Sequence, residues 1–191
     1  MAHKREAEKS KSDATLPDNP TPAPYLTDIL RSDLDLIFVG AAASLHSARA
    51  NHWYAGPSNR FYLLLHQSGL TPYRLEPEED ETLPQYGIGL TCLHKYSASS
   101  ANHLLPSPTE EQREIVMEKL LRFAPKIVCF NGKDVYGMVT GKVCTDWGEQ
   151  EEKIGNSLVY VVQSSSGRAD LWGRERLEGY QGIKARLDQM K

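Results

Sequence analysis

The sequence predicts an α/β fold, a three-layer sandwich in which a central four-stranded parallel sheet is flanked by helices. Four short apolar runs have the length and composition of buried strands, at residues 34–40, 86–93, 126–130 and 157–162. Segments with helical character separate these runs. Strands that alternate with helices pair in parallel through right-handed crossovers, so the carboxyl ends of all four strands should lie at one edge of the sheet.

The helices between the strands have local start and stop signals. Residues 109–123 begin with a Pro-Thr-Glu-Glu capping pattern and carry apolar residues at helical spacing. Residues 59–68 form another expected helix, which Gly69 ends. A further helix is expected to begin at about Lys133, and a last one, at 174–190, closes the chain.

The remaining segments are expected to be less regular. Residues 1–24 are charged and then rich in proline, which predicts a mobile tail, and residues 25–191 are expected to form a single domain. A short lead-in helix is expected at 25–32. The acidic run Glu76–Glu81 should be a solvated surface, and residues 143–156 should be irregular.

The composition excludes several classes of protein. A net charge of −3 excludes a globally basic nucleic-acid binder but allows a local basic groove. No apolar run approaches the roughly 20 residues of a membrane helix, and the first residues lack the apolar centre of a secretory signal. Three cysteines without CxxC spacing predict free thiols in a reducing compartment, and neither a zinc nor an iron–sulfur site. We therefore expect a nuclear protein if the source is eukaryotic and a cytoplasmic one otherwise.

Small and polar residues dominate the loops after the four strands, GAAASLHS, TCLHKYS, FNGKD and QSSSGRADLW. None is a GxxxxGK[ST] or GxGxxG nucleotide motif. Small residues beside an aromatic side chain leave room for a flat ring, and neutral donors at helix starts bind phosphate without net positive charge. The carboxyl edge of the sheet is therefore the predicted ligand site.

Four motifs in and around these loops resemble a known family. In order and spacing, YAGPSNRFY, YGIGLT, KIVCFNGK and SSSGRADLW resemble the mismatch-specific uracil/thymine branch of the uracil-DNA glycosylase superfamily, over residues 34–187. The resemblance implies the fold predicted above and a monomeric, monofunctional DNA N-glycosylase without a cofactor. Its partner would be double-stranded DNA with a mismatched or modified base. It would flip and excise a pyrimidine of the uracil, thymine or 5-carboxylcytosine class, in base-excision repair or demethylation.

The resemblance also implies roles for individual residues. Tyr54 corresponds to the aromatic ring that stacks on the flipped base, and the other positions expected at the base are Ala41, Ala42, Cys92 and Asn131. The positions expected to contact DNA are Ser47, Lys133, Ser164, Ser165, Ser166, Gly167 and Arg168. Arg168 corresponds to the side chain that fills the space left by the flipped nucleotide.

Two positions depart from the family pattern. Ala42 aligns with the asparagine that positions the attacking water, and Cys92 with an aspartate proposed as an alternative catalytic group in bacterial relatives. Alanine has no polar side-chain atom and a neutral thiol orients water poorly, so another side chain must hold the water. We expect His52 to do so, with Asn51 and Asn59 as further candidates.

Ordinary structural roles remain open for several of these residues. His52 is alternatively a hydrogen-bonded loop histidine, Asn59 a helix cap and Tyr54 a core residue. His46 and His94 are interpreted as loop or surface residues.

Two other functions also remain open. The first is a binder of mismatched or modified DNA that no longer hydrolyses the glycosidic bond, which Ala42 and Cys92 favour. The second is a nucleotide hydrolase, against which the absence of a carboxylate cluster or metal motif counts.

Overall fold

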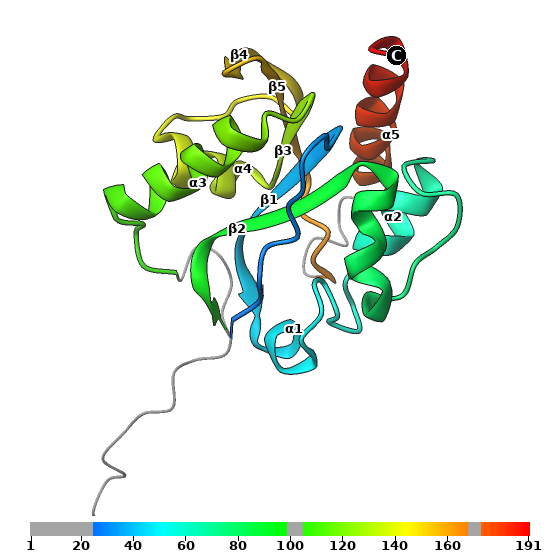
Figure 1. Cartoon of the computed structure of the whole chain (residues 1–191), viewed down its shortest axis with the longest axis horizontal. Coiled ribbons are helices and arrows are strands. Elements are labelled where there is room, and N and C mark those ends of the chain that lie inside the picture. The colour runs from blue at the N-terminus through cyan, green and yellow to red at the C-terminus, as the bar shows by residue number, and fades with distance from the viewer. Residues whose placement is uncertain (1–24, 99–104, 168–172) are drawn as a thin grey trace, which may run out of the picture.

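A computed structural model describes residues 25–98, 105–167 and 173–191 (Figure 1). The centre of the molecule is a five-stranded sheet in the order β2-β1-β3-β5-β4. The strands are β1 (Leu36–Ser44), β2 (Ile88–Ala98), β3 (Ile127–Asn131), β4 (Gly148–Ile154) and β5 (Ser157–Val162). The pairs β1–β2, β1–β3 and β3–β5 are parallel, whereas β4 pairs with β5 antiparallel. The predicted α/β class is confirmed, with one strand more than predicted.

Helices cover both faces of this sheet. They are α1 (Leu45–Ala50), α2 (Phe61–Gln67), the 3₁₀ helix η1 (Pro77–Tyr86), α3 (Glu110–Phe123), α4 (Lys133–Thr140) and α5 (Gly173–Gln189). Figure 1 shows α3 and α4 on one side of the sheet and α2 and α5 on the other. The α2/α5 side buries an aromatic centre in which the Phe38 ring packs against Phe61 and Tyr180. The three-layer arrangement follows from these two separate cores.

The prediction that residues 143–156 are irregular is wrong for β4. β4 has the sequence GEQEEKI, and its side chains alternate between half-buried and exposed. It pairs with a neighbour on one side only, and an edge strand of this kind needs no continuous apolar run. Hydrophobicity therefore does not reveal it. The two-residue turn Gly155-Asn156 joins it to β5 as a hairpin.

Residues 25–32 form no helix, contrary to the prediction. The Ile29 N–H donates to the Leu90 carbonyl oxygen at 2.9 Å, and the Leu90 N–H donates to the Ile29 carbonyl oxygen at 2.8 Å. This isolated antiparallel bridge lies along β2, at the other edge of the sheet. The segment thus pairs with an otherwise open strand edge instead of satisfying its own backbone in a helix.

β1 and β2 both run farther than predicted. The small residues after Gly40 continue β1 to Ser44, and β2 continues past residue 93 to Ala98. The two strands remain paired up to Ala42 and His94, after which the register shifts. Backbone pairing on the neighbouring strand compensates for the low strand propensity of alanine, so the predicted loop is partly sheet.

The other predicted elements are confirmed to within a few residues. Thr109 caps α3 as expected, because its hydroxyl accepts the Gln112 N–H at 3.2 Å and its own N–H donates to Gln112 Oε1 at 2.9 Å. The predicted tail at 1–24 lies outside the described residues.

Candidate active site at the carboxyl edge of the sheet

The carboxyl ends of β1, β2, β3 and β5 lie at one edge of the sheet, as the alternation of strands and helices predicts. The loop 51–60 and the segment that follows β5 meet at this edge, since the Arg60 N–H donates to the Ser165 carbonyl oxygen at 2.9 Å. Segments far apart in the sequence therefore build one site.

Asn131, at the end of β3, holds three of these segments together. Its Oδ1 accepts the Ser165 N–H at 3.0 Å, and its Nδ2 donates to Ser165 Oγ at 3.1 Å and to Tyr54 Oη at 3.4 Å. Asn131 and Ser165 are both buried. Leaving such buried amides and hydroxyls without partners is costly, so this network fixes Tyr54 and the serine loop (residues 163–167) against the strand end.

The Tyr54 ring is held in a fixed position at the strand edge. It stacks on Phe61 with the ring centroids 4.0 Å apart and an interplanar angle of 22°. Its hydroxyl lies over Gly40, where an added Cβ would be 3.7 Å from Tyr54 Oη. Burial raises the pKa of Tyr54, so the phenol stays protonated. The φ angle of 54° is left-handed, which is unusual for a bulky residue and is sustained only where surrounding contacts enforce it.

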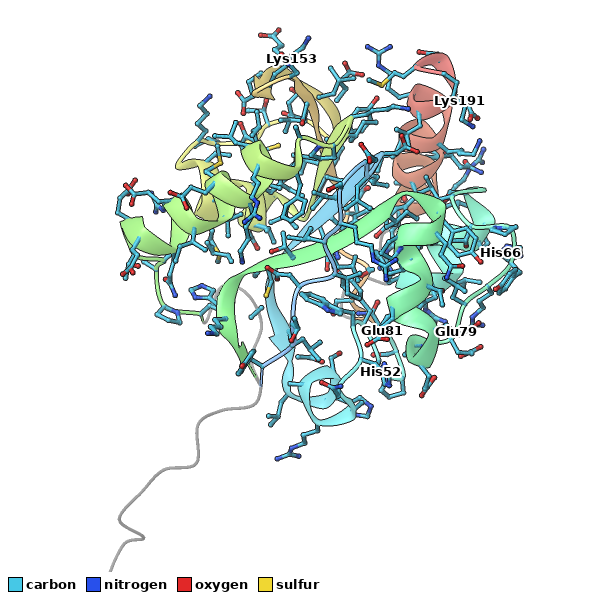
Figure 2. The ribbon with its side chains drawn as sticks, viewed as in Figure 1. His52, His66, Glu79, Glu81, Lys153 and Lys191 are labelled. Atoms are coloured by element: carbon cyan, nitrogen blue, oxygen red, sulfur yellow. The ribbon has the colours of Figure 1, made fainter. Side chains whose placement is uncertain are left out.

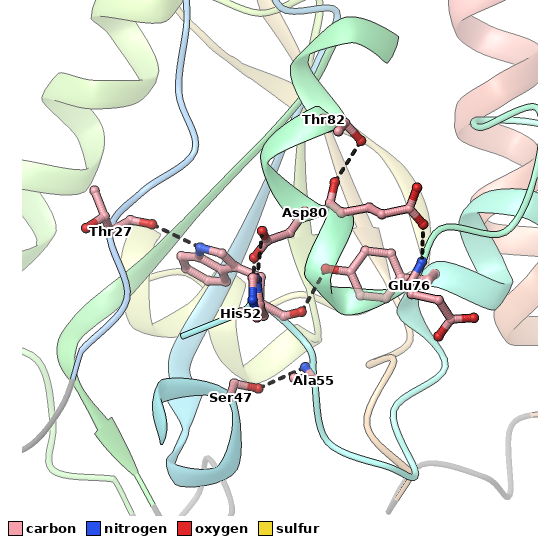
Figure 3. A network of polar contacts seen from close by, with 10 residues as sticks. Thr27, Ser47, His52, Ala55, Glu76, Asp80 and Thr82 are labelled. Atoms are coloured by element: carbon pink, nitrogen blue, oxygen red, sulfur yellow. Dashed lines mark hydrogen bonds and ion pairs between the residues drawn. The ribbon is translucent and has the colours of Figure 1, made fainter. Parts of the chain in front are cut away.

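His52 and the next residue, Trp53, are anchored by a carboxylate that the sequence did not reveal (Figure 3). Asp80 Oδ2 accepts the Trp53 N–H at 2.7 Å, and Asp80 Oδ1 lies 3.2 Å from His52 Nδ1. Asp80 is only 3% exposed, which corrects the prediction that Glu76–Glu81 is wholly a solvated surface. The 3₁₀ turn of η1 directs this one acid of the run inward, and its two polar contacts compensate for burying the carboxyl group.

The other predicted residues of this loop also have structural partners. Ser47 is buried, and its hydroxyl oxygen accepts the Ala55 N–H at 3.1 Å. Asn51 is exposed and ends α1 in a left-handed conformation, with φ of 59°. Asn59 Oδ1 accepts the Phe61 N–H at 3.0 Å at the start of α2. His46 is exposed, in agreement with its interpretation as a loop residue.

The small residues of β1 divide between the two faces of the sheet. Ala41 is buried in the α3/α4 core, so its side chain points away from Tyr54. Ala42 and Gly40 alternate with it, and Gly40 faces Tyr54 and Cys92. Cys92 is buried, its Sγ donates to the His94 carbonyl oxygen at 3.2 Å, and burial raises its pKa to about 12. Cys92 is therefore a neutral thiol at physiological pH.

His94 lies in a strand at this edge, contrary to the prediction. It was expected in a loop or on the surface, whereas it is buried on β2. The period-2 alternation through Leu90 and Cys92, had the strand been extended by one residue, would have placed it on the same face.

Comparison with known proteins agrees with this arrangement. A model of the family described as "Uracil DNA glycosylase superfamily" matches residues 27–187, most of the chain. The chain belongs to this superfamily. In fold it is similar to a solution NMR structure of "a putative Uracil DNA glycosylase from Methanosarcina acetivorans", with a TM-score of 0.60 and 18% sequence identity. That match covers 86% of this chain and 98% of the other.

The serine loop of this superfamily member closes against the turn before α2. Ser164 Oγ accepts the Ser166 N–H at 3.3 Å, and Ser164 and Ser166 are half-buried. Gly167 follows and lies directly against Ser58. Arg168, which is predicted to fill the space left by the flipped nucleotide, lies outside the described residues.

Lys133, at the start of α4, extends toward the loop before β4. Its Nζ lies 4.4 Å from the centroid of the Trp147 ring and donates to the Thr145 carbonyl oxygen. Lys133 is therefore held against the loop before β4.

Two wider features of this uracil-DNA glycosylase superfamily member concern the described residues alone. No helix within 25–98, 105–167 and 173–191 has both the length and the apolar character needed to cross a membrane. The same residues contain no cluster of three or more His, Cys, Asp or Glu side chains suited to a metal ion.

Substituting Gly167 by alanine should destabilise the serine loop. An added Cβ would lie 2.5 Å from Ser58 Cβ and 2.7 Å from the Ser58 carbonyl oxygen, so the backbone must move. We expect a loss of about 1–3 kcal/mol, the usual cost of overpacking, in thermal or urea unfolding. Gly182→Ala is the control, because no heavy atom lies within 4 Å of its added Cβ. Equal stability of Gly167→Ala and wild type would show that the loop is not held as described.

Proposed function

We propose that this protein is a monofunctional DNA glycosylase of the mismatch-specific uracil/thymine branch. It flips a deaminated or modified pyrimidine out of duplex DNA, as a monomer, and hydrolyses its bond to deoxyribose without a metal or cofactor. The observation that carries the proposal is the Tyr54–Asn131–Ser165 network, which holds an aromatic ring beside small residues at the carboxyl edge of the sheet. Base-excision repair or demethylation, in the nucleus or cytoplasm, is the corresponding process.

The reaction does not require a strong nucleophile. The bond from C1′ of the sugar to the base nitrogen breaks, and its electron pair leaves with the base. Water then bonds to C1′ and loses a proton, which leaves an abasic site. Flipping, exclusion of solvent and stabilisation of the departing anion lower much of the barrier, whereas one orienting or proton-accepting group contributes about 10²–10⁴-fold.

The three sequence-based candidates for that group differ in their partners. Asn51 ends α1, and Asn59 binds the Phe61 N–H at the start of α2. His52 has an imidazole that accepts a proton, and Asp80 contacts its Nδ1. Of the three, His52 remains the candidate for proton transfer.

A non-hydrolysing binder of mismatched or modified DNA is the second candidate function. It is favoured by Ala42, which has no polar side-chain atom, and by Cys92, whose buried thiol stays neutral. The binder keeps Tyr54 and the serine loop, so binding alone does not distinguish the two functions.

Single-turnover excision, with gel-shift binding on the same duplexes, tests both. The duplexes carry G·U, G·T, hypoxanthine or 5-carboxylcytosine. Cleavage of at least one, fastest for the best leaving group, is the expected result. Selective binding without cleavage would establish the binder. The absence of both cleavage and binding would contradict both functions.

Arg168→Ala should weaken duplex binding roughly tenfold, because the family resemblance assigns this side chain to the space left by the flipped nucleotide. Gel-shift titration against a mismatched and a fully paired duplex measures the effect. Arg174→Ala is a matched control, since Arg174 is exposed on α5 and pairs with Glu178. Unchanged affinity of Arg168→Ala would contradict the role proposed for Arg168 in filling that space.

A further inference from the structure

His94 lies directly beside the position that lacks its expected polar group. In the parallel register of β1 and β2, Gly40 pairs with Cys92 and Ala42 pairs with His94. Paired residues on neighbouring strands are about 4.8 Å apart and point to the same face. Gly40 faces Tyr54, and Cys92 belongs to the core against which Tyr54 packs. Alternation along the strands therefore places the next pair, Ala42 and His94, on that face too, one step closer to the carboxyl edge.

The imidazole of His94 is buried and has a nitrogen, unpaired in the described part of the chain, that can accept a proton. The residue is 7% exposed, and its Nε2 is buried without a hydrogen-bond partner among the described residues. Burial lowers the pKa of His94, which favours the neutral ring. Buried polar atoms are nearly always paired in folded proteins, so an unpaired Nε2 on the residue that pairs with Ala42 calls for an explanation.

His52 is placed differently. Its Nδ1 is in contact with Asp80 on η1, and its side chain is 28% exposed (Figure 2). No strand pairing connects it with Ala42, whereas His94 is the direct neighbour of Ala42 across β1 and β2.

We propose that His94 holds and activates the attacking water, and so replaces the groups missing at Ala42 and Cys92. This inference rests on the proposed glycosylase function. With its own proton on Nδ1, the neutral ring accepts a hydrogen bond from water at Nε2. As the base departs with the electron pair of the glycosidic bond, the water oxygen bonds to C1′ and its proton passes to Nε2. The imidazolium then returns that proton to the base anion or to solvent.

The test compares His94→Leu and His94→Gln with wild type, in single-turnover excision of the best substrate and in gel-shift binding. His94→Leu should slow excision by about 10²–10⁴-fold with an affinity within about threefold of wild type, since only the proton acceptor is lost. His94→Gln should retain part of the rate, because an amide still orients water. His66→Leu is the matched control, as His66 projects from α2 at the outer surface (Figure 2).

A rescue experiment separates catalysis from packing. Ala42→Asn places an amide beside residue 94 and should restore part of the rate in the His94→Leu background, whereas a purely structural loss would not be recovered. Wild-type rates in both His94 variants, or losses of rate that only follow losses of binding or of thermal stability, would overturn the role of His94 alone. Absence of excision by the wild type on every duplex would overturn the glycosylase function, and the role of His94 with it.

Discussion

Replacing Asn131 by alanine is expected to slow excision by about 100-fold or more. The substitution removes the acceptor of the Ser165 N–H and the donor to Ser165 Oγ and Tyr54 Oη at once. The serine loop and the Tyr54 ring would then lose their common anchor. Displacing a positioned group by about 1 Å costs about 10²-fold in rate, and the unpaired buried N–H costs about 1–3 kcal/mol of stability.

Single-turnover kinetics and urea unfolding measure these two effects separately. Asn156→Ala is the control, because Asn156 is an exposed residue of the β4–β5 turn. If Asn131→Ala lost stability but excised the base at the wild-type rate, the network would be part of the scaffold only. The proposal for the site would then lose its main support.

Asp80→Ala is expected to lower the free energy of unfolding by about 1–3 kcal/mol and to reduce excision as well. The buried Trp53 N–H would lose its partner at 2.7 Å, and the His52 ring would lose its contact with the carboxylate. Trp53 also joins other segments, because its Nε1 donates to the Thr27 carbonyl oxygen and its own carbonyl accepts the Tyr62 hydroxyl. A shift here therefore reaches Tyr54, the next residue.

Thermal unfolding and single-turnover kinetics on Asp80→Ala, Asp80→Asn and Glu81→Ala check this expectation. Glu81 is the exposed neighbour of Asp80 on η1 (Figure 2), so Glu81→Ala should leave stability and rate unchanged. Asp80→Asn retains an oxygen for the Trp53 N–H, so it should keep more stability than Asp80→Ala. Equal stability of all three variants and wild type would mean that the buried carboxylate is dispensable.

The parts of the fold that could be predicted are those in which one sequence signal is decisive. The runs IVCF and SLVYVV lie in β3 and β5, which are buried at every position, so a continuous apolar run identifies them. Thr109 and Gln112 form the cap that marks the start of α3. The common edge of the strand ends then follows from topology alone.

The parts that could not be predicted depend on contacts between distant residues. The acidic run gives no sign that Asp80 is buried, because its partner, the Trp53 backbone N–H, lies in another segment. His94 resembles a loop residue in the sequence, and only pairing with Ala42 extends β2 to include it. β4 has the composition of a surface segment, and it is a strand because its backbone pairs with β5.

β4 also affects how copies of this protein behave toward one another. An edge strand has a row of backbone N–H and carbonyl groups without a partner strand, onto which another chain can add. The exposed positions of β4 are Glu149, Glu151 and Lys153, and charged side chains on an edge strand oppose the addition of another chain. Because Ile29 bridges the opposite edge at β2, the two edges of the sheet are protected differently, by charged side chains at β4 and by a covering segment at β2.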